Sequence, residues 1–195
     1  MKILLLTGPG GDAQGWGDMK VTESVRQACE SLGHPTRVAY VDDEAGFFRL
    51  VDRPDFDIAW SALYHITPNE AFIGRNAEGL WVADVFDERG IPYIGSDSRT
   101  MKAMIDKFRT HEILAAAGVA VPAHVLLRSG DDASAVAYPA FVKPICESRS
   151  VGISDESVVH DEAELRRRIA FVEKEFDEPA LVEEFLPGDE YTALV

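Results

Sequence analysis

Apolar residues in the first half of the chain alternate between short continuous runs and helical spacings. The continuous runs predict four strands, at residues 3–7, 37–41, 56–60 and 91–94. The helical spacings predict two helices, over residues 21–32 and 80–88. The first helix should bury one face, formed by Val21, Val25, Ala28, Cys29 and Leu32. Because strands that alternate with helices usually form a parallel sheet with right-handed crossovers, we expect an α/β domain of Rossmann-like type over residues 1–97.

The second half follows a different pattern, in which strands dominate. A long helix is expected over residues 98–117, ended by Gly118 and Pro122. Strands are expected at residues 124–127, 140–143, 151–153, 180–184 and 191–195. One further helix should begin at Asp161 as its N-cap, with Glu164 at the capping-box position. Its buried face should consist of Leu165, Ile169, Val172 and Phe176. We therefore expect a second, α+β domain over residues 98–195.

Composition narrows the class of protein. The 195 residues are 46% hydrophobic, which is enough to build a core, and the net charge is −15. An acidic protein is poorly suited to bind nucleic acid. The sequence has no apolar run long enough to cross a membrane and no secretory signal, so we expect a cytoplasmic protein without a membrane partner. Residues 99–149 carry seven basic and five acidic residues, so an anionic ligand should bind on this middle segment.

A glycine-rich stretch, Gly8–Ala13, follows the first predicted strand and loosely fits the G-x-G-x-x-A pattern of dinucleotide-binding loops. Two details count against that function. The helical pattern begins near Met19 rather than at Ala13, and Asp42, the acid that would hold a ribose, lies 34 residues past Gly8. Dinucleotide-binding loops usually have about 20 residues at this spacing. A plain turn is therefore the favoured interpretation.

The stretch from residue 141 to 153 carries more chemistry. A predicted strand ends in Lys143, and a small polar loop then leads toward the next strand. Such a loop can fold over phosphates, with backbone N–H groups as donors and the lysine as a point charge. A hairpin with a solvated lysine is the plainer alternative, and Lys107 has the same two interpretations. Glu183, Glu184 and Glu190 either form an exposed acidic edge or bind a purine and its ribose.

Several short motifs occur in a fixed order, and in that order they resemble the D-alanine–D-alanine ligases and their ATP-grasp relatives. The motifs are Gly90–Ser96, Met104–Lys107, Phe141–Pro144, Ser150–Gly152, Leu181–Glu184 and the spacing Glu183-x-x-Leu186-x-x-x-Glu190. The resemblance covers essentially the whole chain and is strongest from Gly90 onward.

The resemblance implies an ATP site and a reaction. Lys107 and Lys143 would contact the ATP phosphates, and the loop Glu147–Gly152 would close over them with the Ser150 N–H near the β-phosphate. The adenosine would be held by Glu183, Glu184, Leu186 and Glu190. The implied activity joins a small-molecule carboxylate to an amine through an acylphosphate, with ATP and Mg²⁺ as cofactors and release of ADP and phosphate. Homodimers are usual among such relatives.

Three positions depart from the family pattern near the substrates. Lys20 stands where the family has a glutamate that binds the ammonium of the first D-alanine. Arg149 replaces the first of two serines in the phosphate loop, and His65 belongs to a changed segment beside the substrate. A cation would repel an ammonium at close range. Arg149 could bind a carboxylate or a phosphate, or it could simply point into solvent. From Lys20 and Arg149 we expect a first substrate that lacks a free α-amino group or bears another acid, with His65 as a further candidate for contact with the substrate.

The family's Mg²⁺ ligands and catalytic arginine would lie in a third, C-terminal subdomain after Val195. We therefore expect no metal ligands and no catalytic residue within these 195 residues. The expected protein is a fragment of a longer ligase, inactive by itself. The rival class is a non-catalytic nucleotide-binding or interaction module without the third subdomain.

Overall fold

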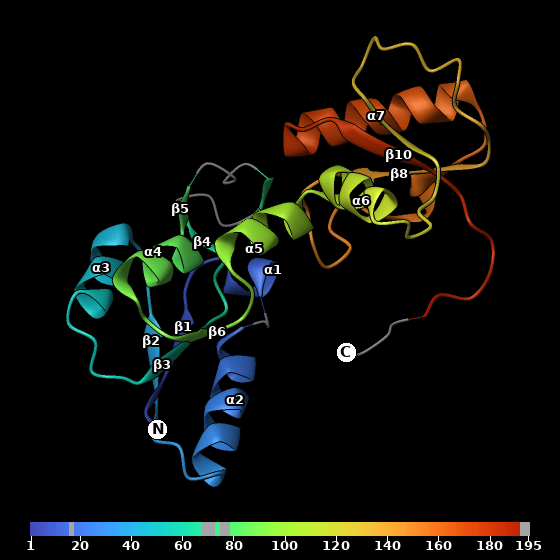
Figure 1. Ribbon diagram of the computed structural model, residues 1–195. Coiled ribbons are helices and arrows are strands. Elements are labelled where there is room, and N and C mark those ends of the chain that lie inside the picture. Colours follow the sequence, from blue (N-terminus) through green and yellow to red (C-terminus); the bar gives the residue numbers. More distant parts are fainter. Residues whose placement is uncertain (16–17, 68–72, 75–78, 192–195) are drawn as a thin grey trace. The chain divides into compact units, whose positions relative to one another are not determined.

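The structure is a computed structural model, which describes residues 1–15, 18–67, 73–74 and 79–191. The chain divides into two compact units (Figure 1). The first consists of Met1–Ile105 with Glu147–Arg149, and the second of Asp106–Cys146 with Ser150–Val195. A domain boundary between residues 97 and 98 stays a prediction.

A parallel sheet forms the centre of the first unit, as the alternation of strands and helices predicts. Its strand order is β2–β1–β3–β6, and every adjacent pair is parallel. The strands are β1 (Ile3–Thr7), β2 (Thr36–Tyr40), β3 (Ile58–Ser61) and β6 (Tyr93–Ile94). The β1 run is buried along its whole length because β1 has a neighbouring strand on each side and packing on both faces. A short antiparallel pair, β4 (His65–Ile66) with β5 (Leu80–Trp81), is also present.

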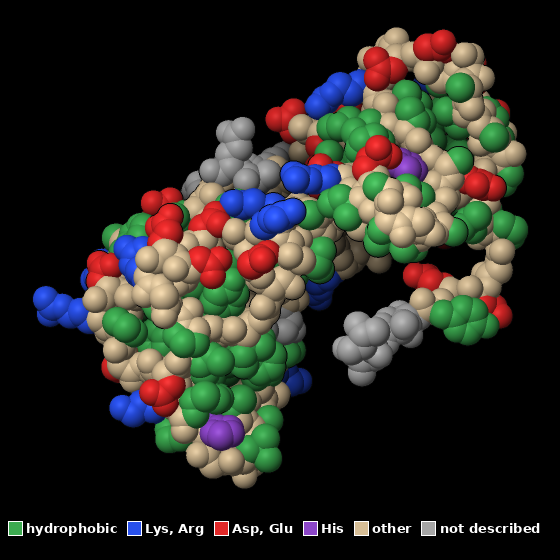
Figure 2. Space-filling view, in the orientation of Figure 1, with side chains coloured by type: hydrophobic (Ala, Val, Ile, Leu, Met, Phe, Trp, Pro, Cys, Tyr) green, Lys and Arg blue, Asp and Glu red, His purple; other side chains and the backbone are tan. Residues whose placement is uncertain are grey.

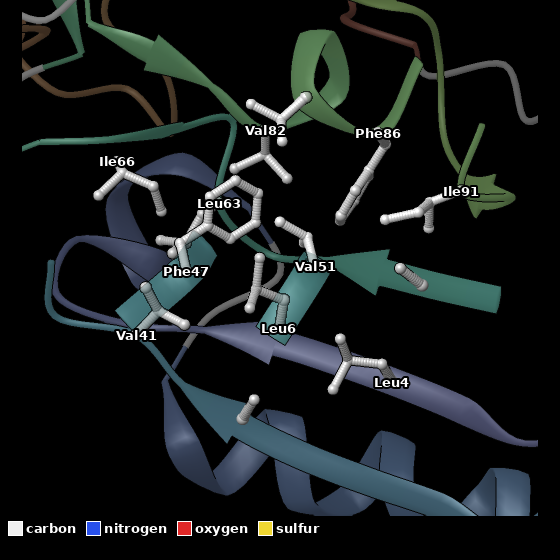
Figure 3. Close-up of a cluster of buried hydrophobic side chains, with 13 residues drawn as sticks. Leu4, Leu6, Val41, Phe47, Val51, Leu63, Ile66, Val82, Phe86 and Ile91 are labelled. Carbon is white, nitrogen blue, oxygen red and sulfur yellow. The ribbon is translucent and has the colours of Figure 1, made fainter. Parts of the chain in front are cut away.

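Helices α3 (Glu44–Val51) and α4 (Val82–Arg89) cover one face of this sheet. Figure 3 shows Leu4 and Leu6 of β1 pointing toward side chains from these two helices. The rings of Phe47 and Phe86 lie 5.9 Å apart in this cluster. Helix α2 (Met19–Ser31) lies on the opposite face, and α5 (Ser98–Ile105) ends the first unit. The sequence pattern did not predict α3 or the four-residue helix α1 (Gly11–Gln14).

The expected buried face of α2 is wrong. Val21 and Leu32 are exposed, Ala28 is exposed, and Cys29 is only half-buried. Thr22 is the one fully buried residue that the structure describes in this helix, and its hydroxyl donates to the Asp18 carbonyl. The short sheet offers α2 little surface beyond β1 and β2, so most of its apolar stripe faces outward.

The second unit is an antiparallel sheet with one long helix against it. The strand order is β7–β10–β8–β9, formed by β7 (His124–Leu127), β10 (Ala180–Glu184), β8 (Ala140–Pro144) and β9 (Val158–Val159). Helix α7 (Glu162–Phe176) packs on β8, β9 and β10. The expected apolar face of α7 is buried as predicted.

Two predicted elements in this half are corrected. The long helix over 98–117 is two helices, because Asp106 interrupts it and caps α6 (Lys107–Ala116) by accepting from the Arg109 N–H at 2.9 Å. Residues 151–153 form a turn rather than a strand, and the neighbour of β8 is instead β9. Within the predicted strand 191–195, Tyr191 is not in a strand, and residues 192–195 lie outside the described residues.

The N-cap of α7 gives a first test of local stability. Asp161 accepts a hydrogen bond from the Glu164 N–H at 2.8 Å, as the sequence predicts. Asp161→Ala should lower the free energy of unfolding of the second unit by about 1 kcal/mol, because a helix N–H loses its acceptor. Asp161→Asn keeps an acceptor and should cost much less. Urea denaturation followed by circular dichroism measures both, and equal costs for the two variants would contradict the capping role.

The surface carries acidic side chains on both units, interspersed with basic ones on the face shown in Figure 2.

In the described part of the chain, no helix is both long enough and apolar enough to cross a membrane.

Candidate functional site

Lys143 and Glu183 form an ion pair on one face of the second sheet. In the antiparallel register, Lys143 lies opposite Leu181 and Glu183 lies opposite Phe141, so the two charged side chains are diagonal neighbours on the same face. The Lys143 Nζ is 2.7 Å from the Glu183 Oε2, and only 18% and 8% of these side chains are exposed. Since an ammonium has three N–H donors, the pair leaves Lys143 with further donors for a ligand.

Lys107 lies at the end of the same strand. Helix α6 begins where β8 ends, and the Lys107 N–H donates to the Ile145 carbonyl at 3.1 Å. The Lys107 Nζ donates to the carbonyl oxygens of Pro144 and Ile145, at 3.3 and 3.1 Å. These carbonyls directly follow Lys143 in the chain. The structure thus brings together Lys107, Lys143 and Glu183, three of the residues predicted to bind ATP.

Two histidines on the same face of the second sheet were not predicted as site residues from the sequence. His111 is one helical turn after Lys107, and its Nδ1 lies 3.5 Å from the Glu183 Oε1. Burial lowers the pKa of His111, although the Glu183 carboxylate opposes that shift. The ring of His124, whose residue pairs with Glu183 across β7 and β10, lies 4.8 Å from the His111 ring. The i, i+4 spacing from Lys107 was the one signal that pointed to His111.

The predicted phosphate loop, Glu147–Gly152, is divided between the two units. The Glu147 carboxylate is buried in the first unit, where it accepts from the N–H groups of Ile73 and Gly74 at 3.3 and 2.9 Å. Arg149 and Ser150 are exposed and both have left-handed backbones, with φ of 53° and 60°. Such strained conformations in residues with a Cβ cluster at functional loops.

The remaining predicted adenosine contacts follow β10. The Glu184 N–H donates to the Ala123 carbonyl at 2.8 Å, while its side chain, Leu186 and Glu190 are exposed. A cavity of about 280 Å³ lies against the strand ends, with Glu183 and Glu184 in its wall. That volume is near the lower limit of about 300 Å³ for ligand pockets. Its walls include Val125, Ala140 and Val182, which alternate with the residues of the ion pair along their strands. The cavity therefore lies on the other face of the sheet from Lys143 and the Glu183 side chain.

The predicted substrate residues of the first unit lie in different surroundings. Lys20 is exposed in the first turn of α2, where its N–H donates to Asp18. His65 is buried with 1% exposure, and its ring meets the Trp81 ring edge-on at 5.4 Å. The Gln14 Oε1 accepts from the N–H groups of Tyr64 and His65, at 2.7 and 3.0 Å, and so fixes this segment. Burial lowers the pKa of His65 to about 4.

An aromatic pocket of about 350 Å³ opens at the carboxyl ends of β3 and β6 in the first unit. Its walls include Trp60, Tyr64, Trp81, Phe86 and Tyr93. Ligands of open parallel sheets bind at this edge of the strands. The sequence did not predict this pocket because these residues come from three separate segments, 60–64, 81–86 and 93–96, that meet only in the fold.

Among the described residues, no group of three or more His, Cys, Asp or Glu side chains is arranged to hold a metal ion. Two acids of the candidate site are engaged otherwise: Glu183 pairs with Lys143, and Glu147 accepts from backbone N–H groups.

The chain is similar in sequence to D-alanine–D-alanine ligases. Residues 113–195 match the family described as D-ala D-ala ligase C-terminus. The D-alanine–D-alanine ligase of Syntrophotalea carbinolica is 30% identical over 195 residues, which are 98% of this chain and 58% of the relative. The ligase of Polaromonas sp. is 34% identical over 161 residues, covering 75% of this chain and 46% of the relative.

Solved structures agree in fold. The D-alanine–D-alanine ligase of Bacillus anthracis superposes with a TM-score of 0.67 at 20% identity, over 96% of this chain and 58% of that one. The VanG D-Ala:D-Ser ligase of Enterococcus faecalis gives 0.64 at 18% identity, over 96% and 63%. The chain thus spans about half the length of the curated relatives it matches. The sequence matches along most of the chain, together with the shared mixed α/β fold of one parallel and one antiparallel sheet, place this protein in the D-alanine–D-alanine ligase-like ATP-grasp family.

Proposed function

We propose that the protein contributes the nucleotide-binding part of an ATP-dependent carboxylate–amine ligase. The observation that carries the proposal is the convergence of Lys107 and Lys143 at the end of β8, beside Glu183. The protein as a whole has a net charge of −15, but here two lysines lie on adjacent parts of the backbone. Their two ammonium groups are suited to bind a polyphosphate. Membership in a family of named ligases supports the reaction class.

ATP would supply the phosphoryl group that activates the carboxylate for attack by the amine. Lys143 and Lys107 would hold the phosphates by charge-assisted hydrogen bonds, and Glu183 would keep the Lys143 ammonium in place through their 2.7 Å contact. The backbone of Glu184 and Leu186, which follows Glu183 along and beyond β10, would lie beside the adenine. We propose that Mg²⁺ enters with the nucleotide and offsets the charge of its phosphates.

Lys20 and Arg149 bear on the first substrate. Both are exposed cations at positions where the family pattern has a glutamate and a serine. We propose that the first substrate lacks a free α-amino group or carries an additional acid, because these cations would repel an ammonium and attract a carboxylate. The side chain of His65 is buried, so it would influence the substrate only indirectly, through the residues packed around it. The proposed partners are small molecules, and a homodimer stays a prediction.

Nucleotide binding is tested by calorimetric titration of this chain with ATP and Mg²⁺, and separately with adenosine. We expect Lys107→Met to weaken ATP binding about tenfold and to leave adenosine binding unchanged, because only the phosphates contact the ammonium. Lys174→Met, which removes a lysine that is 82% exposed on α7, is the matched control. If the wild-type chain bound no ATP, or if Lys107→Met weakened adenosine equally, the proposed site would be wrong.

The reaction is tested by release of ADP in the presence of candidate acids and amines, once with these 195 residues and once with the chain joined to the C-terminal part that its relatives possess. We expect turnover only in the longer protein, so turnover by the 195 residues alone would contradict the fragment prediction. Binding of ATP without turnover by the longer protein would favour a non-catalytic nucleotide-binding module. Acids without an α-amino group should support more turnover than D-alanine, and Lys20→Glu should shift the preference toward D-alanine. Full turnover by the wild-type protein with D-alanine alone would contradict the substrate proposal.

A further inference from the structure

Helix α7 contains three consecutive arginines, and one of them points inward. Arg166 pairs with Glu162 on the surface and Arg167 is exposed, whereas Arg168 is only 4% exposed, beside the core residues Leu165 and Ile169. Burying a guanidinium is costly unless its donors find acceptors. In the described chain, no carboxylate lies within ion-pair distance of Arg168. The guanidinium must therefore donate to uncharged acceptors, and the position of these acceptors in the chain indicates the role of Arg168.

Both described acceptors of Arg168 belong to the segment that leaves the predicted phosphate loop. Its Nη2 donates to the Gly152 carbonyl and, at 3.0 Å, to the Ser157 Oγ. The guanidinium also stacks on the Phe171 ring, 4.4 Å from its centroid. Ser157 itself is buried, and its hydroxyl closes a capping box by accepting from the Ser154 N–H at 3.0 Å. One buried side chain thus connects α7 to two points of residues 152–157.

Gly152 is held equally firmly by packing. Its φ is +77°, and a Cβ at this position would lie 2.6 Å from the Pro144 Cγ and 2.8 Å from the Phe176 Cζ. Two residues earlier, Ser150 has a left-handed backbone, and its carbonyl accepts from the Ile153 N–H at 3.0 Å. The backbone from Ser150 to Gly152 therefore stands in a fixed position relative to β8, whose Pro144 follows Lys143.

We propose that Arg168 is a positioning residue for nucleotide binding, which clamps the Gly152 end of the loop so that the Ser150–Gly152 backbone faces the phosphates held by Lys143. The inference rests on the proposed function. A loop that is ordered before the ligand arrives loses less conformational entropy on binding, so the clamp raises affinity for the phosphates and leaves adenosine binding unaffected.

The test compares Arg168→Met, Arg168→Lys and Ser157→Ala with Arg167→Met, an exposed arginine of the same helix, as the control. Amide hydrogen exchange is measured at residues 150–157 and along α7, and affinities are measured for ATP with Mg²⁺ and for adenosine. We expect Arg168→Met to lose exchange protection at residues 150–153 and to reduce the ratio of ATP affinity to adenosine affinity about tenfold, which corresponds to one charge-assisted hydrogen bond. Arg168→Lys should restore part of the exchange protection and part of the affinity ratio, and Arg167→Met should change neither quantity.

The outcomes separate the two proposals. If wild-type protein binds ATP and Arg168→Met keeps the wild-type affinity ratio, the positioning role is wrong while the proposed function stands. If wild-type protein binds no ATP, the proposed function is wrong and the role of Arg168 in nucleotide binding falls with it. Should Arg168→Met fail to fold, Ser157→Ala decides, because loss of one acceptor must still lower the protection of residues 150–153 and the affinity ratio.

Discussion

Lys143→Met should lower the free energy of unfolding of the second unit by about 3 kcal/mol, even in the absence of any ligand. The substitution keeps most of the length of the side chain but leaves the Glu183 carboxylate, which is 8% exposed, without its ammonium partner. Removing one member of a buried ion pair costs more than the pair contributes, because the remaining charge stays desolvated. The His111 ring, 3.5 Å from the other carboxylate oxygen, can offset part of the loss only by taking up a proton.

A double-mutant cycle isolates this effect. Glu183→Gln should cost less than Lys143→Met, because the 18% exposed lysine can turn its ammonium toward water. The double variant should recover at least about 1 kcal/mol relative to Lys143→Met, since no unpaired charge remains. Lys174→Met serves as the surface control and should change stability by less than about 0.5 kcal/mol. Urea denaturation followed by circular dichroism gives the four values, and additive costs in the cycle would contradict a coupled pair.

The sequence predicted best the strands that coincide with a continuous apolar run. Strands β1, β7 and β10 match their predicted ranges, because each run is apolar enough to be recognised without knowing its neighbours. The break at Asp106 was invisible, since this residue interrupts an otherwise regular helical pattern. Helix α6 starts there because the Lys107 N–H finds the Ile145 carbonyl, a partner from a distant part of the chain. Only tertiary structure supplies that information.

In the candidate site, too, single residues could be predicted from the sequence, whereas the contacts between them depend on tertiary structure. Resemblance to the family pointed to Lys143 and Glu183 as single residues, but their contact depends on the register of β8 and β10. Arg168 was hidden for a related reason. In sequence it is one of three arginines at helical positions, and only the packing of α7 decides that this one turns inward toward Gly152. A solvated helix face is the ordinary expectation for such a run.

The stability of the first unit should fall steeply between pH 6.5 and pH 4, and His65 should be the cause. Within the described residues, neither ring nitrogen of His65 meets the geometry of a hydrogen bond, and burial lowers the pKa of this side chain to about 4. The unfolded chain therefore binds a proton near pH 6.5, whereas the folded unit binds it only near pH 4. Because the unfolded state holds more protons in this window, stability is lost as the pH falls, by up to about 1.4 kcal/mol per pH unit and about 3 kcal/mol in total.

Tryptophan fluorescence measures this effect in the first unit alone, because Trp16, Trp60 and Trp81 all belong to residues 1–105. Thermal unfolding at pH 7, 6, 5 and 4 should show a falling midpoint for the wild type. His65→Leu should remove most of the slope, since it fills the same apolar site beside Trp81 without a group that titrates. His160→Gln, a change at an exposed histidine of the second unit, should leave the slope intact. The carboxylates with lowered pKa in the first unit, among them Asp84 and Asp97, change stability only as the unfolded chain takes up their protons, below about pH 5, so the slopes are compared between pH 7 and pH 5. A slope that persisted in His65→Leu would therefore assign the acid sensitivity to another group and contradict a neutral, buried His65.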